Sequence, residues 1–483
     1  MRPKLELLSP DMIEAVLAEA FQLMREPGIK VQCDEARALL ADHGARVEGE
    51  VVRIPEALAR QALASAPHEF DVYSRDGGAS VHYGGDAVSF DPGSSGVHVL
   101  DPETLEHKSS MAADLARIVM VAEGLPEFAA QSTAVVCNDV AKDVGDLYRL
   151  YVVLLYSRKP VITGAFSSRT TQVMIDMLAA VSGGRKALAE RPRAVFDVCP
   201  SPPLIWSEFG AQNLIDLARA RVPAELISMP LAGAAAPVTL LGSIVQHAAE
   251  SISGITIHQL ANPGAPVVWG GAPAIFDMRQ GTTPMGAVET AMIDAAYAQV
   301  AQSLGLPTHG YLCASDAKIV DAQAGLESGV TAMLGALAGI NMISGAGMLD
   351  FLACFSVEKL VIDAEAIGMA HRMLSGIEQR TPTLATQMFA GIDLKGDFLK
   401  QKITRQLFGK EQHLPSPVID RGSIRTWQER GSLDTFARAK ARVKELLTGY
   451  QKPGLAPEAE RDLRGIVERE ARKAGMDKLP VLP

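Results

Sequence analysis

Seven apolar runs of strand length alternate with amphipathic helical stretches from about residue 128 onward. Each run leads into a turn rich in Gly, Ala or Ser, and the helical stretch that follows ends at Gly or Pro. The runs are FAAQSTAVV, VITGAF, RAVFDVCPS, AELISMPLAG, APVVWGGAP, THGYLCAS and INMISGAG. Continuously apolar strands that alternate with helices predict an α/β fold with a parallel sheet covered on both faces.

Prolines support these strand assignments, because proline ends a helix and donates no hydrogen bond to a sheet. Five runs have a proline just ahead of them or at their start: Pro160, Pro192, Pro223, Pro266 and Pro307. Seven units are closer to a (β/α)8 TIM barrel than to a six-stranded doubly wound sheet, which is the alternative fold. The eighth strand has two candidates, LATQMF at residues 384–389 or a segment from the N-terminal region.

The two ends of the chain follow other patterns. Before the barrel, two helical segments precede the short alternating stretches FDVYSRD, VHYGG, AVSFDPG and VHVLD, which predict a small β meander. After it, LDTFARAKARVKELLTGY and APEAERDLRGIVEREARKAG predict charged helices packed outside the barrel. We therefore expect a cap at residues 1–125, the barrel at residues 126–375 and a helical extension at residues 376–483.

Charge and cysteine content narrow the functional classes. The net charge of −10 and the pI near 5.6 disfavour binding to nucleic acid or to an anionic membrane. Two long uncharged stretches, residues 226–249 and 328–349, are broken by Gly, Pro and Ser, so we expect barrel strands and helices rather than membrane spans. Five cysteines without a C-x-x-C pair predict neither zinc nor disulfides, and the N-terminus lacks the features of a signal peptide. The sequence predicts a cytoplasmic protein without a bound metal.

Three turns after the predicted strands consist of very small residues: PLAGAAAP, GGAP and SGAGML. Barrel active sites lie at the carboxyl ends of the strands, and glycine lets a ligand approach the backbone closely. The turns place Gly233, Ala234, Gly270, Gly345 and Gly347 at this rim. They indicate an open, ligand-accepting mouth, and close strand-to-helix packing is the alternative interpretation.

Aromatic residues are few, yet several fall near the same ends of the strands. Trp269 and Tyr311 end two strand runs, Phe276 follows the turn after Trp269, and Phe351 and Phe355 follow SGAGML. An ammonium ion over an aromatic face gains about 0.5 to 2 kcal/mol per ring. These rings are candidates for a quaternary-ammonium site, and core packing is the alternative for any one of them.

Charged candidates lie near the same rim. Asp316 directly follows a strand run and is the candidate catalytic residue, since its carboxylate could balance an ammonium charge or cap the next helix. Arg279 and His309 are candidates for binding a substrate carboxylate. His247 and His258 are eleven residues apart on one predicted helix, where we expect surface residues rather than metal ligands.

Several motifs are absent from the sequence. It contains no Walker G-x-x-x-x-G-K, no G-x-G-x-x-G opening a helix, no H-E-x-x-H and no C-x-x-x-C-x-x-C. These absences disfavour nucleotide-binding, zinc-protease and iron–sulfur functions. The D-x-H-x-x-G signature of base-off corrinoid binding is also absent, so we do not expect the chain to carry its own corrinoid.

Three long segments resemble the trimethylamine:corrinoid methyltransferase superfamily. They are PLAGAAAPVTLLGSIVQHAAESISGITIHQLANPGAPVVWGG, SDAKIVDAQAGLESGVTAMLGALAGINMISGAGML and SVEKLVIDAEAIGMAHRM. A weaker likeness covers FDVYSRD to HKSS and RAKARVKELL, so the resemblance spans nearly the whole chain. No pyrrolysine is written in the sequence, so within this superfamily it resembles the branch without pyrrolysine, which includes glycine betaine:corrinoid methyltransferase.

The resemblance implies a TIM barrel whose carboxyl-end face receives a separate corrinoid protein, with Gly233, Ala234, Gly345 and Gly347 in the corrinoid-facing rim. The implied substrate is a small quaternary or tertiary methylated amine, from which the methyl group passes to a Co(I) corrinoid. A quaternary nitrogen leaves as a neutral amine, so the enzyme's task is positioning and desolvation. Two alternatives stay open, transfer of the methyl group directly to a pterin and a betaine-binding protein without activity. A homo-oligomer is also possible.

Overall fold

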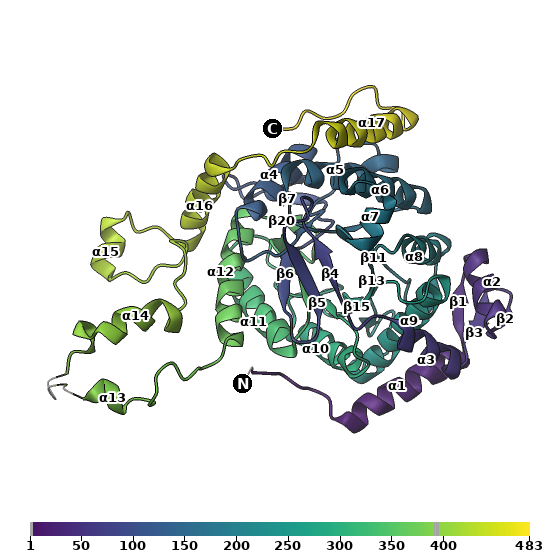
Figure 1. The fold of residues 1–483 in the computed structure, drawn as a ribbon, viewed down its shortest axis with the longest axis horizontal. Coiled ribbons are helices and arrows are strands. Elements are labelled where there is room, and N and C mark those ends of the chain that lie inside the picture. The colour runs from purple at the N-terminus through teal and green to yellow at the C-terminus, as the bar shows by residue number, and fades with distance from the viewer. Residues whose placement is uncertain (1–2, 391, 393–395) are drawn as a thin grey trace.

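The computed structural model describes residues 3–390, 392 and 396–483. Parallel strands run through the centre of the molecule, and a ring of helices surrounds them (Figure 1). The outer helices are α5 (Gly145–Tyr156), α6 (Ser168–Ser182), α8 (Glu208–Ala220), α9 (Leu240–Ala261), α10 (Val288–Ser303), α11 (Ala322–Ala338) and α12 (Val357–Leu374). The alternation of apolar strand and helix in the sequence therefore corresponds to the observed α/β architecture.

The central strands form two parallel sheets. One has the order β15-β13-β11-β10-β9 and the other the order β17-β18-β6. Their bounds are β6 (Ser89–Pro92), β9 (Gln131–Ser132), β10 (Val161–Gly164), β11 (Ala194–Val198), β13 (Ala224–Ser228), β15 (Val267–Gly271), β17 (His309–Tyr311) and β18 (Met342–Ala346). All seven predicted apolar runs contain one of these strands, so those predictions are confirmed.

The eighth strand, β6, comes from the N-terminal region and pairs with β18, whereas residues 386–389 form the short helix α13 (Thr386–Phe389). Hydrogen bonds also link the two sheets at both pairs of edges. The amide of Trp269 donates to the Pro307 carbonyl at 2.9 Å, and the amide of Ala129 donates to the Phe90 carbonyl at 2.9 Å. The inner faces of the sheets therefore lie opposite each other around one interior.

A hairpin fills this interior at the amino ends of the strands. It consists of β4 (Glu69–Tyr73) and β5 (Ser80–Gly84). Its Val72 and Tyr83 pack against residues from both sheets, among them Val195, Val268 and Met342. This apolar layer fills the interior at the amino ends of the strands.

The N-terminal strands do not form one meander, which corrects the prediction from the sequence. β4 pairs only with β5, β6 joins the central sheet, and β7 (His98–Leu100) pairs with β8 (His107–Ser109) and with β20 (Cys354–Phe355). The predicted strands are present, but β6 and β7 pair with strands that are far away in the sequence. Strand pairing depends on tertiary contacts that a local pattern does not contain.

Helix α9 is buried along most of its length, because α1 (Pro10–Arg25) and α3 (Glu56–Ser65) cover the side that faces away from the strands. His247 and His258 on this helix are fully buried, so the prediction that they lie at the surface was wrong. The Nδ1 atom of His247 accepts a hydrogen bond from Trp269 Nε1 at 3.4 Å, and its ring stacks on Tyr297 at 4.0 Å. The two N-terminal helices explain why polar residues of α9 are enclosed.

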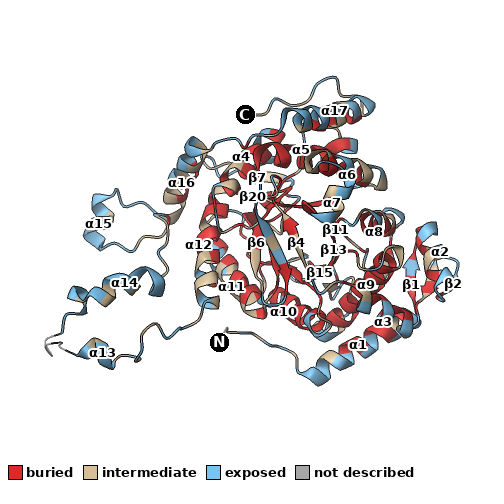
Figure 2. Cartoon of the chain, in the orientation of Figure 1, coloured by how far each residue is buried: buried red, intermediate tan, exposed pale blue. Residues whose placement is uncertain are grey.

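The C-terminal part of the chain first extends away from the body and then packs against it again. Residues 377–390, 392 and 396–433 belong to an arm with α13, α14 (Lys402–Glu411) and α15 (Ile424–Glu429), and these residues extend beyond α12 and are largely exposed (Figures 1 and 2). Helix α16 (Thr435–Gly449) then packs on α12, and α17 (Pro457–Lys473) packs on α6. Among the described residues, every helix is too short or too polar to span a membrane.

Candidate active site

Polar side chains replace apolar ones on the inner faces of the strands, one layer above the hairpin. Successive side chains of a strand point to opposite faces, so Val195 and Asp197 on β11 both point inward. Glu225 on β13 and His309 on β17 lie in the same interior and are almost completely buried. The alternation of the strands thus gathers three titratable groups from both sheets at one point.

Glu225 and His309 meet across Gly270, which lies on the strand between them. His309 Nδ1 lies 2.5 Å from Glu225 Oε1, but the two groups are not aligned as a hydrogen bond. A Cβ atom on Gly270 would lie 3.0 Å from both of these atoms. The missing side chain at Gly270 is therefore what allows the two groups to approach each other.

Burial makes the charged forms of these groups unfavourable. Desolvation raises the pKa values of Glu225, Asp197 and Asp91 well above their usual range, and it lowers the pKa of His309 to about 3. Asp91 is the best compensated, because Ser344 Oγ donates to its carboxylate oxygens at 2.5 and 2.8 Å. Both carboxylate oxygens of Glu225 and Nδ1 of His309 lack a hydrogen-bond partner among the described residues. Glu225 is therefore an acid of the cluster that has no hydrogen-bond donor among the described residues.

Tyr311 forms one wall above this cluster. Its ring edge meets the ring of His309 at a centroid distance of 5.0 Å, and its hydroxyl lies 2.7 Å from Ser94 Oγ in the loop after β6. Around it lies an apolar rim formed by Ile227, Ala274 and Met285 together with the partly buried Cys199, Leu231, Ala272 and Leu352. We call this end of the interior, where the apolar rim lies above the acidic cluster, the mouth.

A buried arginine lies at the same mouth. Arg149 on α5 donates from Nη1 to Ser95 Oγ at 3.0 Å and to the Thr133 carbonyl at 3.1 Å, and its guanidinium lies over the exposed ring of Phe166. Its Nε atom is buried without a hydrogen-bond partner among the described residues. Burial lowers the pKa of Arg149, and the charge of Asp197 opposes this effect. The mouth thus contains an incompletely partnered cation as well as acids.

The structure does not bring the predicted aromatic cage together. Trp269 points away from the interior to His247 on α9, because its neighbours Val268 and Gly270 occupy the inward positions of β15. Phe355 is fully buried and packs against Gly347 behind the strands. Only Tyr311 among these rings faces the acidic cluster. Replacing Trp269 is therefore expected to lower stability rather than ligand affinity.

The remaining predicted residues occupy loops above the strands, where most have structural partners. Asp316 accepts hydrogen bonds from the amides of Met285 and Gly286 at 2.8 and 3.0 Å. Arg279 is exposed and pairs with Asp277 at 2.9 Å. Phe351 lies under the ammonium group of Lys318. Phe276 follows β16 (Ala274–Ile275) and is half-buried. Asp316 braces a loop at the mouth rather than facing the cluster.

The four small residues predicted for the rim divide into two pairs. Gly233 and Ala234 are exposed in the loop after β14 (Leu231–Ala232) and are open to a large ligand. Gly345 and Gly347 are buried, and side chains at these positions would collide with the Leu312 carbonyl and the Phe355 ring. Close packing, the alternative considered from the sequence, therefore explains the second pair.

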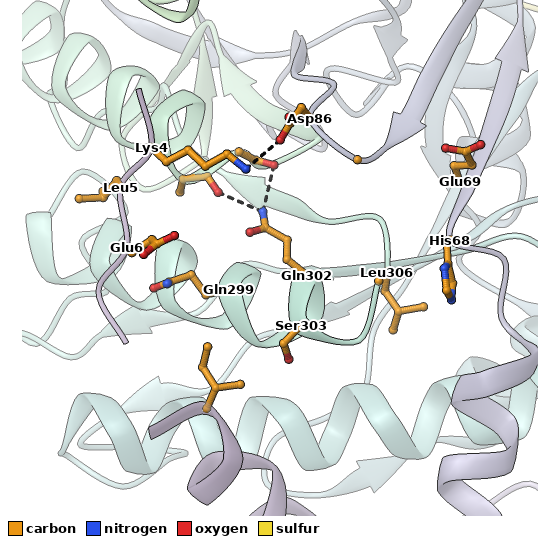
Figure 3. A pocket seen from close by; sticks show the side chains of 15 residues that line it. Lys4, Leu5, Glu6, His68, Glu69, Asp86, Gln299, Gln302, Ser303 and Leu306 are labelled. Carbon is orange, nitrogen blue, oxygen red and sulfur yellow. Dashed lines mark hydrogen bonds and ion pairs between the residues drawn. The ribbon is translucent and has the colours of Figure 1, made fainter. Parts of the chain in front are cut away.

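A separate cavity of about 520 Å³ lies at the opposite end of the strands. Figure 3 shows its lining, in which Lys4 pairs with Asp86 and the side-chain Nε2 of Gln302 donates to the backbone carbonyls of Ala338 and Gly339. These polar groups pair with groups of the protein itself, and the hairpin separates them from the acidic cluster. We place the candidate active site at the mouth, where buried polar atoms lack partners. The described residues contain no group of three His, Cys, Asp or Glu arranged to hold a metal ion.

Sequence reasoning missed Glu225, Asp197, Asp91 and Arg149. The signal was present, because an acid interrupts each of three otherwise apolar strand runs, in AELIS, AVFDV and VSFDP. A buried strand tolerates a carboxyl group only where the interior is polar or binds something. Arg149 carried no such signal, since it lies in an ordinary helical stretch.

Comparisons with known proteins agree with this architecture. The family model described as trimethylamine methyltransferase (MTTB) matches residues 1–476, so the chain belongs to this family. It is 31% identical to trimethylamine methyltransferase MttB of Desulfitobacterium hafniense, over 97% of this chain and 94% of that protein. Identity is 33% with MttB of Methanosarcina barkeri, covering 96% of this chain and 95% of that protein. The resemblance stated from the sequence is confirmed.

Two further similarities concern substrate and fold. A glycine betaine methyltransferase of Desulfitobacterium hafniense is 28% identical, over 98% of each chain. The crystal structure of monomethylamine methyltransferase MtmB from Methanosarcina barkeri superposes with a TM-score of 0.56 at 13% identity, covering 98% of this chain and 90% of that chain. At this identity the structural likeness supports the fold alone.

Proposed function

We propose that this protein transfers a methyl group from a small quaternary or tertiary methylated amine to the corrinoid of a separate protein. The observation that carries the proposal is the cluster of Glu225, Asp197 and Asp91 below an apolar rim, in which the buried Glu225 carboxyl lacks a hydrogen-bond partner among the described residues. Membership of the trimethylamine methyltransferase family supports the reaction class. The similarity to both a trimethylamine and a glycine betaine enzyme supports a methylated amine as the donor.

The ammonium group would lie between the ring of Tyr311 and the carboxyl groups of Glu225 and Asp197. A methylated ammonium has few or no N–H donors, so charge, ring faces and apolar contact must recognise it. The cation would favour ionisation of the acids and would thereby satisfy the groups that lack partners in the protein alone. Binding and charge compensation therefore occur together.

The apolar rim supports the chemistry by excluding water. Ile227, Leu231 and Ala272 surround the mouth, and removal of water strengthens the electrostatic contact below them. When the C–N bond breaks, its electron pair stays on nitrogen, so a quaternary donor leaves as a neutral amine. The protein then needs to position the donor, and no residue has to supply a proton.

The carboxyl-end face fits a large, flat group carried by another protein. Gly233 and Ala234 are exposed there, as are the apolar side chains of Phe166, Met229 and Met278 in neighbouring loops. Gly233 and Ala234 would lie against the corrinoid, which in its Co(I) form supplies the nucleophile that accepts the methyl group. The cognate corrinoid protein is thus the proposed partner.

Arg149 supports a donor that carries a carboxylate. Its buried, incompletely partnered guanidinium lies at the mouth near Tyr311 and Asp197, and guanidinium groups bind carboxylates well. A betaine-like zwitterion would place its ammonium over the acids and its carboxylate toward Arg149. A glycine betaine-like substrate therefore uses more of the mouth than trimethylamine does.

We also propose that the two sheets form one closed (β/α)8 barrel. The hydrogen bonds from Trp269 to Pro307 and from Ala129 to Phe90 support closure at both pairs of edges. Residues 126–375 supply seven of its strands, residues 1–125 act as a cap that also supplies β6, and residues 376–483 form an outer extension. Five unpaired cysteines fit a reducing compartment, which supports a cytoplasmic location.

One assay tests activity and substrate together. The purified protein is incubated with Co(I) cobalamin and a panel of glycine betaine, proline betaine, carnitine and trimethylamine, and methylation of cobalt is followed by absorbance. We expect turnover with at least one carboxylated quaternary amine. Absence of turnover with every amine, together with tight binding of one of them, would favour a binding protein over an enzyme.

A further inference from the structure

The loop that follows β6 contacts both a ring and a cation of the candidate active site. It has the sequence Gly-Ser-Ser-Gly at residues 93–96. Ser94 is buried, and its Oγ atom lies 2.7 Å from the hydroxyl of Tyr311. Ser95 is exposed, and its Oγ atom accepts a hydrogen bond from Arg149 Nη1 at 3.0 Å. Two adjacent serines thus contact the two groups proposed for opposite ends of a zwitterionic donor.

Ser95 adopts a backbone conformation that is unfavourable for a serine. Its φ is +64°, which lies in the left-handed region. The Cβ atom of an L-amino acid crowds its own backbone there, whereas glycine adopts this conformation without the same cost. Strain of this kind at a residue other than glycine is concentrated at functional sites. The turn alone favours glycine at this position, so the hydroxyl group of Ser95 is the feature that needs an explanation.

Arg149, the partner of Ser95, is a buried cation whose direct contacts are neutral. The residue is 1% exposed. Among the described residues, its guanidinium contacts the Ser95 hydroxyl, the Thr133 carbonyl at 3.1 Å and the ring of Phe166, whose centroid is 4.8 Å from Cζ. Its Nε atom has no hydrogen-bond partner among these residues. Burial of a charge is costly unless a group of opposite charge accompanies it, so the guanidinium favours an anionic ligand.

Phe166 covers the guanidinium and can give an anion access to it. The ring is 52% exposed, so few contacts hold it in place. The backbone of the same residue is fixed, because its amide donates a hydrogen bond to Asp146 Oδ2 at 2.7 Å. The side chain can therefore turn aside while the loop between β10 and α6 stays where it is. A carboxylate would then contact the guanidinium at the place of the ring.

We propose that Ser95 is a specificity-determining residue that completes a carboxylate subsite with Arg149. This inference rests on the proposed function, because the carboxylate belongs to a zwitterionic methyl donor. The Ser95 oxygen holds Nη1 in place, and the hydroxyl proton is free to donate to the same carboxylate, since the hydroxyl donates to none of the described residues. A donor with a carboxylate gains these hydrogen bonds and a donor without one does not. The subsite therefore selects betaine-like amines over simple methylated amines.

Two substitutions at Ser95 and two donors test the inference. Glycine betaine carries the carboxylate, and tetramethylammonium has a quaternary nitrogen without one. For Ser95→Ala and for Ser95→Gly, kcat/KM and the calorimetric affinity for glycine betaine should each fall about tenfold, whereas the values for tetramethylammonium should stay within about twofold of the wild type. The affinities are measured without corrinoid, so this readout does not depend on turnover.

Thermal melts separate this role from a structural one. Ser95→Gly should melt at a higher temperature than Ser95→Ala, because only glycine removes the strain, while both variants lose the same preference for glycine betaine. Ser432→Gly is the matched control, since Ser432 is exposed with a φ of +53° and lies outside the site. It should also relieve strain, and its affinities for both donors should equal those of the wild type.

Three results would overturn the inference. Losses that are equal for the two donors, or that follow the melting temperatures of the two variants, would make Ser95 a structural residue. A wild type that uses tetramethylammonium and neither binds nor uses glycine betaine would remove the carboxylate subsite and leave the proposed function standing. A wild type that neither binds nor uses any methylated amine would overturn the inference and the proposed function together.

Discussion

Two groups of buried charged residues lie on opposite sides of β17 and β18, and they differ in whether the protein supplies their hydrogen-bond partners. Behind the strands, Lys359 Nζ donates to Asp363 Oδ2 at 2.6 Å, to Ser328 Oγ at 2.7 Å and to the Cys313 carbonyl at 3.3 Å. Inside the strands, both carboxylate oxygens of Glu225 lack a hydrogen-bond partner among the residues that the structure describes. The burial is the same, but only the first group is compensated by the protein itself.

This difference in hydrogen bonding distinguishes buried charges that hold the fold together from those that bind a ligand. A buried ion pair with all its hydrogen bonds holds neighbouring elements in place, and Asp363 also accepts the amide of Gly347 at 2.7 Å. Unpartnered buried acids reduce stability and are retained where a ligand completes them. We therefore assign Lys359 and Asp363 to the scaffold and Glu225 to the donor site, and the predictions below test this division.

The largest expected effect is on stability at the compensated pair. Lys359→Met would leave the buried Asp363 carboxylate without its cation, and breaking one partner of a buried pair costs about 3–5 kcal/mol. Chemical denaturation should show this loss. Lys186→Met, which removes an exposed partner of Glu190, is the control and should change the free energy of unfolding by less than about 0.5 kcal/mol. Equal effects of the two variants would contradict the assignment.

Glu225→Gln should have the opposite signature. The amide cannot ionise to balance an ammonium, so kcat/KM for methyl transfer should fall at least 100-fold, about 2.7 kcal/mol. Stability should stay equal or rise at pH 8, because a carboxyl with a raised pKa in the folded state opposes folding as the pH rises.

Glu250→Gln is the matched control for this variant. Glu250 is also fully buried, but it accepts hydrogen bonds from Ser228, Gln246 and the amide of Leu204 outside the strands. We expect it to lose stability and to retain kcat/KM. Glu225→Gln with normal turnover and a lower melting temperature would place Glu225 in the scaffold instead.

Gly270→Ala should have a smaller effect at the same site. The added methyl group would lie 3.0 Å from Glu225 Oε1 and His309 Nδ1 and would force them apart. We expect kcat/KM to fall about tenfold and stability to fall by about 1–3 kcal/mol through overpacking. Gly164→Ala, whose methyl group would meet Asp197 at an ordinary 3.4 Å, should be milder in both assays. Indistinguishable kinetics of the two variants would count against a functional contact across Gly270.

The sequence predicts the strands of the scaffold better than the residues of the site. Seven strands were identifiable because their apolar runs are continuous, whereas β6 is four residues long and ends in Pro92. Alternate residues of β15 point into the interior and toward the outer helices. Because every residue of this run is apolar or glycine, the sequence does not show to which of the two sides Trp269 points. The acids inside strands were visible, but only the structure shows that their side chains converge.

The last expected effect is confined to the pH dependence of stability and concerns Asp316, whose pKa burial raises to about 6. An unfolded Asp titrates near pH 3.9, so the folded state binds this proton more tightly. The stability that Asp316 contributes is therefore present below about pH 4 and is lost as the pH rises to about 6. Asp316→Asn should reduce the difference in unfolding free energy between pH 4 and pH 7 by about 2 kcal/mol. An unchanged pH profile by denaturant titration would contradict this environment for Asp316.

The most direct test of the central claim is proton release on donor binding. Because desolvation raises the pKa values of Glu225 and Asp197 and a bound ammonium favours their ionised forms, donor binding should be coupled to the release of a proton. Calorimetric titration with the active amine, in buffers of different ionisation enthalpy at pH 6, 7 and 8, should show this release. Affinity should rise with pH by up to about tenfold per unit for each proton lost. The carbon isostere, with C in place of N⁺, should bind without release. Binding that is independent of pH, or equal release with the isostere, would contradict the account.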